Sequence, residues 1–183
     1  MIPKLYFITG SSGVGKTPLV DILKSILPDN FDIHDLDEKL IEVDRTKSSW
    51  LHDWRNKATQ YFIDQAIQNI KVKKSTVVCG IVWPHEVQTV SNIKLAPPIK
   101  FIFLDVEPQE LKKRFFARRW SDENKIADLK KDTGMTPDEY IQRNTIEIEE
   151  LKKECIKNVA KIIDTTNLDS RIVAEEVRDF LFE

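Results

Sequence analysis

Residues 5–17 read Leu-Tyr-Phe-Ile-Thr-Gly-Ser-Ser-Gly-Val-Gly-Lys-Thr, an apolar run followed by a complete G-x-x-x-x-G-K-[ST] pattern at positions 10–17. The apolar run predicts a buried β-strand, and apolar residues on helical spacing begin directly after the pattern. Such a strand–loop–helix points backbone N–H groups inward, where they bind phosphate. We therefore predict nucleotide contacts from the eight loop residues, Gly10, Ser11, Ser12, Gly13, Val14, Gly15, Lys16 and Thr17.

Two side chains of this loop have specific expected roles. Lys16 is long enough to reach the β and γ phosphates of a nucleoside triphosphate as a point charge. The Thr17 hydroxyl is placed to ligate Mg²⁺. Pro18 follows the pattern and is tolerated there, because an N–H in the first helical turn has no intrahelical partner.

Five short apolar runs alternate with longer segments of helical periodicity, which predicts an α/β protein with a five-stranded parallel sheet and helices on both faces. The expected strands are 5–9, 31–35, 76–79, 99–104 and 161–164, and the expected helices are 18–27, 50–70, 108–119, 136–159 and 170–181. The 183 residues are the size of a single domain. Segment 120–134 is the least apolar part of the chain, so we expect a mobile flap there.

The composition argues against several kinds of partner. Lys and Arg total 28 against 30 for Asp and Glu, so the chain has no general attraction for nucleic acid or an anionic membrane. No apolar run approaches the ~20 residues that span a bilayer. Cys79, Cys155 and the three histidines show no metal-ligand spacing, so neither a disulfide nor a zinc site is expected. Because the first strand begins by Leu5, leaving no room for a signal peptide, we expect a cytoplasmic location.

Acidic residues follow the second expected strand. Strands adjacent to the loop strand end near the γ-phosphate, so we expect Asp35 to act in metal binding and catalysis. Asp37 would accept a hydrogen bond from a substrate hydroxyl. The alternative is a turn of solvated acids before a helix, because acids cluster at helix N-termini.

Arg114 and Arg118 are four residues apart on an expected helix and therefore share one face. An arginine pair can stack on adenine and neutralise charge on a transferring phosphoryl group; a solvated basic helix face is the alternative. The polar loop after the fifth strand contains Thr165 and Asn167, whose short side chains could border the base. An ordinary strand-to-helix connection would have the same composition.

Other residues bear on the acceptor side of the predicted site. Gly80 follows the third strand, where a small residue lets a substrate approach the backbone closely. Trp50, Trp54 and Trp83 cluster around the same region, and an indole ring can supply stacking surface to a sugar or a base. Core packing is nevertheless the commoner role of tryptophan.

On these residues the chain resembles the P-loop small-molecule kinases, the group that includes adenylate, shikimate and gluconate kinases. The resemblance implies a three-layer sandwich with ATP and Mg²⁺ bound at the loop, and a short lid at 120–134 that follows the Arg114–Arg118 pair. It also implies that the loop with Thr165 and Asn167 lies on the adenine side.

The acceptor half resembles more than one branch of this group. Asp35-Leu36-Asp37 is similar to the D-x-D motif of shikimate kinases, and Trp54-Arg55 to their F-R pair, which implies that Arg55 binds an anionic group of the substrate. Arg143 resembles a post-lid arginine. Cys79-Gly80-Ile81 departs from the triple glycine of shikimate kinases, so the acceptor is not identified.

Together these features predict a phosphotransferase that uses ATP and Mg²⁺ and acts on a small-molecule acceptor that is shikimate-, gluconate- or nucleotide-like. A monomer or a homodimer is expected. The alternative is a nucleotide-binding sensor or adaptor that phosphorylates no metabolite, since the acceptor residues match no single kinase family.

Overall fold

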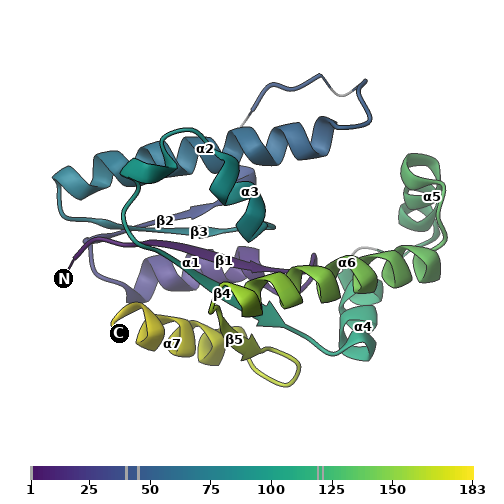
Figure 1. Cartoon of the computed structure of the whole chain (residues 1–183). Coiled ribbons are helices and arrows are strands. Elements are labelled where there is room, and N and C mark those ends of the chain that lie inside the picture. Colours follow the sequence, from purple (N-terminus) through teal and green to yellow (C-terminus); the bar gives the residue numbers. More distant parts are fainter. Residues whose placement is uncertain (1, 40, 45, 119, 121) are drawn as a thin grey trace.

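The centre of the molecule is a five-stranded parallel sheet in the order β2-β3-β1-β4-β5 (Figure 1). The structure is a computed structural model that describes residues 2–39, 41–44, 46–118, 120 and 122–183, without the side chains of residues 118 and 132. The strands are β1 (Leu5–Gly10), β2 (Phe31–Asp35), β3 (Ser75–Cys79), β4 (Ile99–Asp105) and β5 (Lys161–Asp164). The five expected strands and the α/β class are confirmed.

Helices cover both faces of this sheet (Figure 1). One face carries α2 (Trp50–Lys71), the short α3 (Pro84–Thr89) and the C-terminal part of α6 (Pro137–Lys157). The other face carries α1 (Lys16–Ile26) and α7 (Ser170–Leu181). Beyond the end toward which the strands point lie α4 (Pro108–Arg118), α5 (Glu123–Thr133) and the beginning of α6. None of the described helices combines the length and the apolar character needed to cross a bilayer.

β1 shows why the sheet is the core. All six of its residues are buried, with Leu5 and Phe7 facing the α2 side and Tyr6 and Ile8 facing α1 and α7. A strand covered on both faces needs an uninterrupted apolar run rather than an alternating one. The same sequence property that predicted the strand therefore also explains its burial on both faces.

The strand order corrects one premise of the sequence interpretation. β3 and β4 lie beside β1, whereas β2 pairs with β3, so the strand that ends at Asp35 is not adjacent to the loop strand. The register places Asp35 opposite Cys79, and Cys79 opposite Ile8 of β1. Because all five strands are parallel, their carboxyl ends still meet at one edge, and Asp35 reaches that edge from one strand further away.

Two helices differ from what the sequence led us to expect. The segment expected to be a flap contains α5, whose N-cap is Asp122, with a side chain that accepts from the Lys125 N–H at 3.0 Å. Gly134, at φ +72°, ends this helix. Helix α3 begins at Pro84, in a stretch where no helix was expected. Figure 1 shows α5 standing away from the sheet, beyond α4 and α6.

Candidate active site

The loop between β1 and α1 has a backbone that favours glycine. Gly10, Gly13 and Gly15 have φ values of +147°, +83° and +108°. A Cβ on Gly10 would lie 2.4 Å from the carbonyl oxygen of Leu104, whereas one on Gly15 would meet nothing within 4 Å. Gly10 is thus required for the close contact with β4, and Gly15 borders the open space in front of the loop.

This loop presents donors that suit a phosphate. Helix α1 begins at Lys16 with Gly15 as its N-cap, so no side chain accepts from the first-turn N–H groups. The Ser11 hydroxyl is buried and has no hydrogen-bond partner among the described residues. The Lys16 ammonium donates to the carbonyl oxygens of Gly10 at 2.8 Å and Ser11 at 2.6 Å. An uncapped helix N-terminus beside a lysine held on the same loop fits an anionic ligand.

A cleft of about 500 Å³ opens on this loop. It is lined from the loop, from the carboxyl ends of β2 and β3, and from helices α2 and α4. Predicted site residues from distant parts of the chain meet in its wall: Ser12, Gly13, Gly15, Lys16, Thr17, Asp35, Asp37, Trp54, Arg55, Gly80 and Arg114. Most of the predicted donor and acceptor residues therefore belong to one cavity.

Asp35 is held in a fixed orientation at the edge of this cleft. It caps the 3₁₀ turn η1 (Leu36–Glu38): its Oδ1 accepts from the Asp37 N–H at 3.0 Å, and its own N–H donates to Glu38 Oε2 at 3.4 Å. Asp35 therefore is an acid at a helix N-terminus, as the alternative expectation had it, and it also lines the cleft. Asp35 and Thr17 line the same cavity, which fits a Mg²⁺ ion that takes few protein ligands and completes its shell with phosphate oxygens and water. Among the residues that the structure describes, no cluster of three or more His, Cys, Asp or Glu side chains could hold a metal by itself.

Arg114 connects the phosphate loop to the β5–α7 connection. Its Nη2 donates to the carbonyl oxygens of Thr165 at 2.7 Å and Thr166 at 3.2 Å, and its Nη1 to that of Val14 at 3.4 Å. Arg114 also lines a second cavity of about 250 Å³ between the loop and the start of α7, to which Val14 and Thr165 contribute. Asn167, expected in the same place, is not part of that lining.

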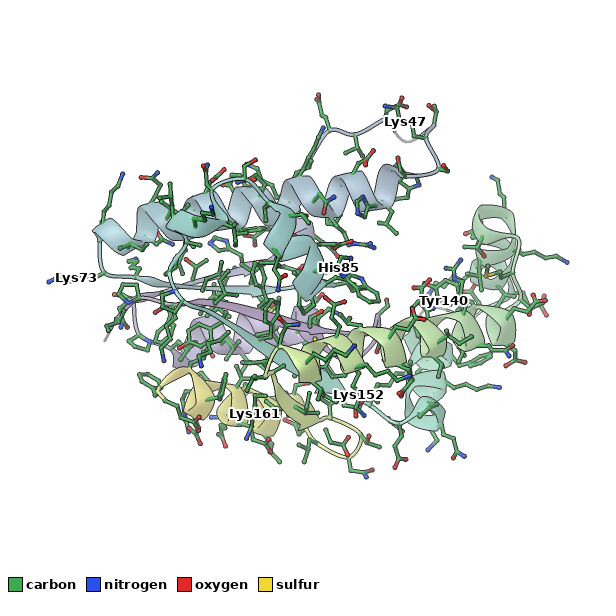
Figure 2. The ribbon with its side chains drawn as sticks, in the orientation of Figure 1. Lys47, Lys73, His85, Tyr140, Lys152 and Lys161 are labelled. Carbon is green, nitrogen blue, oxygen red and sulfur yellow. The ribbon has the colours of Figure 1, made fainter. Side chains whose placement is uncertain are left out.

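Two predicted arginines are not placed in the cleft. The side chain of Arg118 lies outside the described residues, so its predicted role stays a prediction. Arg143 lies on α6, where its Nε is 3.8 Å from Glu147 Oε1 and its guanidinium is 5.4 Å from the ring centroid of Tyr140. Arg143 does not line the cleft. Its neighbour Tyr140 is labelled on α6 in Figure 2.

Arg55 reaches the cleft but already has an anionic partner. Its Nη2 donates to Glu86 Oε1 at 2.9 Å and its Nε to Glu86 Oε2 at 3.3 Å. The Glu86 side chain is 2% exposed and that of Arg55 is 20% exposed. The sequence interpretation missed Glu86, because it lies 31 positions away on α3, a helix that was not expected.

Packing accounts for some of the residues that were expected on the acceptor side. Gly80 lines the cleft, but a Cβ there would lie 2.3 Å from the Cβ of Leu36, so close packing against η1 is sufficient to require glycine. Trp54 lines the cleft, and Trp50 joins it in a third cavity of about 800 Å³. Trp83 packs with the cluster around Phe103, which is the core role that tryptophan more often has.

Similar folds occur among solved structures. A shikimate kinase from Bacteroides thetaiotaomicron matches 98% of this chain and 98% of its own, with a TM-score of 0.58 and 16% identity. The tunicamycin resistance protein of Deinococcus radiodurans matches 98% of this chain and 95% of its own (TM-score 0.59, 16% identity). A gluconokinase from Sinorhizobium meliloti matches 99% and 97% (TM-score 0.53, 14% identity).

No family model matches the chain, and no curated protein matches it. At identities of 14% and 16% the structural likeness establishes the fold. The expected fold of the P-loop small-molecule kinases is therefore confirmed, over nearly the whole chain.

Proposed function

We propose that this protein is a phosphotransferase that uses ATP and Mg²⁺ and moves the γ-phosphoryl group to an oxygen of a small-molecule acceptor. The observation that carries the proposal is the convergence of Lys16, Asp35 and Arg114 on one cleft, although they come from three separate elements. The fold shared with a shikimate kinase and a gluconokinase supports it.

The donor would lie across the loop, with its base in the 250 Å³ cavity and its phosphates in the larger cleft. Both cavities share Gly13, Gly15 and Arg114, so one extended ligand would contact both without leaving the loop. The loop N–H groups and the Lys16 ammonium would hold the β and γ phosphates. Arg114, fixed by the Thr165 carbonyl, would place a positive charge between base and phosphates.

Thr17 and Asp35 are the residues that would hold Mg²⁺, which when bound neutralises charge on the phosphate oxygens. Asp37 follows Asp35 in the same cleft and would accept a hydrogen bond from the acceptor hydroxyl, turning its oxygen toward the phosphorus. Most of the rate enhancement would then come from positioning and charge neutralisation. Helix α5, at the place of the expected lid, would move to exclude water.

Lys16→Ala tests the proposal. It removes the one loop ammonium while leaving the apolar face of α1 intact, so turnover should fall by about 10²-fold or more, the scale expected for one electrostatic contact to the transition state. The measurement is ATP consumption with sugars, polyol acids, nucleosides and nucleoside monophosphates as acceptors. Lys157→Ala, at an exposed position in the last turn of α6, is the matched control and should retain full activity.

Circular dichroism and thermal unfolding of both variants would separate a lost contact from a lost fold. Undiminished phosphorylation by Lys16→Ala would contradict the proposal. ATP binding without any acceptor-dependent turnover across the panel would favour a sensor or adaptor instead. The metal requirement is tested by adding a chelator and then restoring activity with Mg²⁺.

A further inference from the structure

The cleft continues past Asp37 into the cavity of about 800 Å³, which borders the first turns of α2. Asp37, Leu51 and Trp54 line both spaces, and Trp50 lines the far one. A pocket for one drug-sized ligand has roughly 300–1,000 Å³. The cleft alone, at about 500 Å³, is therefore large enough for the phosphates and a small acceptor, and the far cavity is additional space.

The two halves of α2 use their apolar residues differently. In the second half, Phe62 and Ile63 are buried against the sheet. The first turns extend past the ends of β2 and β3 in Figure 1, and their apolar residues line the cavities instead. Leu51 is 47% exposed there and shares one cavity with two tryptophans. A group of exposed apolar side chains that continues from a cleft is typical of a ligand-binding groove.

The far cavity has two walls that are held in place. Ile41, in the segment before α2, and Trp54, on α2, both pack against the same core cluster. The Lys57 ammonium donates to the backbone carbonyl oxygen of Glu42 at 3.1 Å, which ties that segment to the helix. The cavity is therefore a groove between a chain segment and α2, and Trp54 is a wall that it shares with the cleft.

The side chains of this groove favour a flat ring. Trp50 and Trp54 are four residues apart on α2, so their side chains lie on one face of the helix. Indole rings pack with other rings in offset-stacked or edge-to-face arrangements. A flexible chain with the same number of carbon atoms would lose rotational freedom in the groove and could not stack. An aromatic ring therefore gains more from these walls than an alkyl chain does.

Asp37 lies where the cleft meets the groove, because it lines both. Lys16 and Thr17 line the cleft and not the groove, so a donor on the loop would lie on the other side of Asp37. In the proposed reaction, Asp37 accepts a hydrogen bond from the acceptor hydroxyl. An acceptor that brings its hydroxyl to this carboxylate from the side away from the donor would extend along Trp54 toward Trp50.

We infer that the groove is a second subsite for the acceptor, and that the acceptor is an alcohol that carries an aromatic ring beyond the hydroxyl that is phosphorylated. Trp50, Leu51 and Trp54 bind the ring and determine specificity, while Asp37 takes the hydroxyl. The role of the subsite in transfer rests on the proposed function, whereas binding of a ring in the groove needs no transfer. The subsite places no condition on the charge of the rest of the acceptor.

The binding test uses protein saturated with ADP and Mg²⁺, so that the loop is occupied, and titrates methyl, hexyl and phenyl β-D-glucopyranoside. These probes share their hydroxyl groups and differ in one substituent. The indole N–H signals of the four tryptophans are followed by NMR. The phenyl glucoside should shift the signals of Trp50 and Trp54 and leave that of Trp83, in another core cluster, in place. It should bind about tenfold more tightly than the methyl glucoside and about threefold more tightly than the hexyl glucoside.

Variants in the groove locate the binding site of the ring. Trp50→Ala and Leu51→Ala should each weaken binding of the phenyl glucoside by about threefold or more and leave that of the methyl glucoside unchanged. Ile172→Ala, on α7, is the matched control, because Ile172 is also 47% exposed and lines none of the three cavities. It should change neither affinity. If Trp50→Ala does not fold, Leu51→Ala decides.

The inference is overturned if the phenyl glucoside binds no more tightly than the methyl or the hexyl glucoside, or if Leu51→Ala behaves like Ile172→Ala. Turnover gives an independent readout. For the acceptor that the panel of alcohols identifies, Leu51→Ala should raise KM by about threefold or more and leave kcat within about twofold. An acceptor without an aromatic ring whose KM stays unchanged in Leu51→Ala would also overturn it. Binding of the ring at Trp50 without turnover of any acceptor would support the subsite and count against the proposed function alone.

Discussion

Replacing Arg55 by methionine should destabilise the fold far more than a change at a partly exposed arginine normally does. Methionine keeps much of the aliphatic length and removes the guanidinium, so the change isolates the ion pair. Glu86 would then remain as a carboxylate that is 2% exposed, without the donors that now contact its oxygens at 2.9 Å and 3.3 Å. The cost is the penalty of a buried, uncompensated charge.

The structure sets the size of this cost. Removing one partner of a buried ion pair costs about 3–5 kcal/mol. The lower end applies here, because the Arg55 side chain is 20% exposed and its loss would admit water toward Glu86. For a chain of this length, about 3 kcal/mol corresponds to a fall in Tm of about 6–12 °C. Glu86→Gln should cost less, about 1–2 kcal/mol, because a partly exposed guanidinium can turn to solvent.

Urea unfolding followed by circular dichroism measures these free energies. Arg143→Met is the matched control, since Arg143 and its partner Glu147 are 46% and 58% exposed and the change should cost at most about 0.5 kcal/mol. The double variant Arg55→Met/Glu86→Gln should recover about 2 kcal/mol relative to the sum of the single changes. A cost for Arg55→Met that equals that of Arg143→Met, or no recovery in the double variant, would refute the reasoning.

Three further predictions concern other parts of the fold. Gly80→Ala would place a methyl group 2.3 Å from the nearest side-chain carbon and should lower the unfolding free energy by about 1–3 kcal/mol in urea titrations; an unchanged midpoint would contradict this. Burial raises the pKa of the Cys79 thiol and raises that of Cys155 to about 12, so a thiol reagent should label neither in the native protein and both after unfolding. The hydrogen bond to Asp105 raises the pKa of Lys152 above its usual value of 10.5. The contribution of this charged lysine to stability is therefore complete below the usual pKa and is lost as the pH rises through the raised pKa. The stability difference between the unmodified protein and Lys152→Met should therefore be constant between about pH 6 and 9 and shrink in more alkaline solution, and a difference that grows there would disprove the assignment.

The phosphate loop and the strands could be predicted because their signals are local. In β1, six consecutive buried residues produce an uninterrupted apolar run, and the positive φ values of Gly10, Gly13 and Gly15 explain why glycine recurs there. Each of these features is contained within a few neighbouring residues. Periodicity and motif spacing are therefore sufficient to find them.

Strand order and α5 were harder to predict for physical reasons. The position of β2 beyond β3 depends on which helix crosses which face of the sheet, and the composition of β2 does not contain that information. Helix α5 has an Asp122 N-cap and a Gly134 C-cap, which are local signals. A helix that stands away from the sheet has little apolar surface to bury, so α5 has few apolar residues. This low apolar content led the sequence interpretation to predict a flap despite the two capping signals.

The acceptor half shows where a local pattern is incomplete. Trp54-Arg55 predicted an anion-binding residue, because an arginine at the edge of a cleft normally offers its charge to a ligand. Glu86 contacts Arg55 from 31 positions away, through two hydrogen bonds that exist only because α3 packs against α2. The charge available to a ligand is the sum over the assembled wall, so a motif read along the chain gives the residue type but not its effective charge.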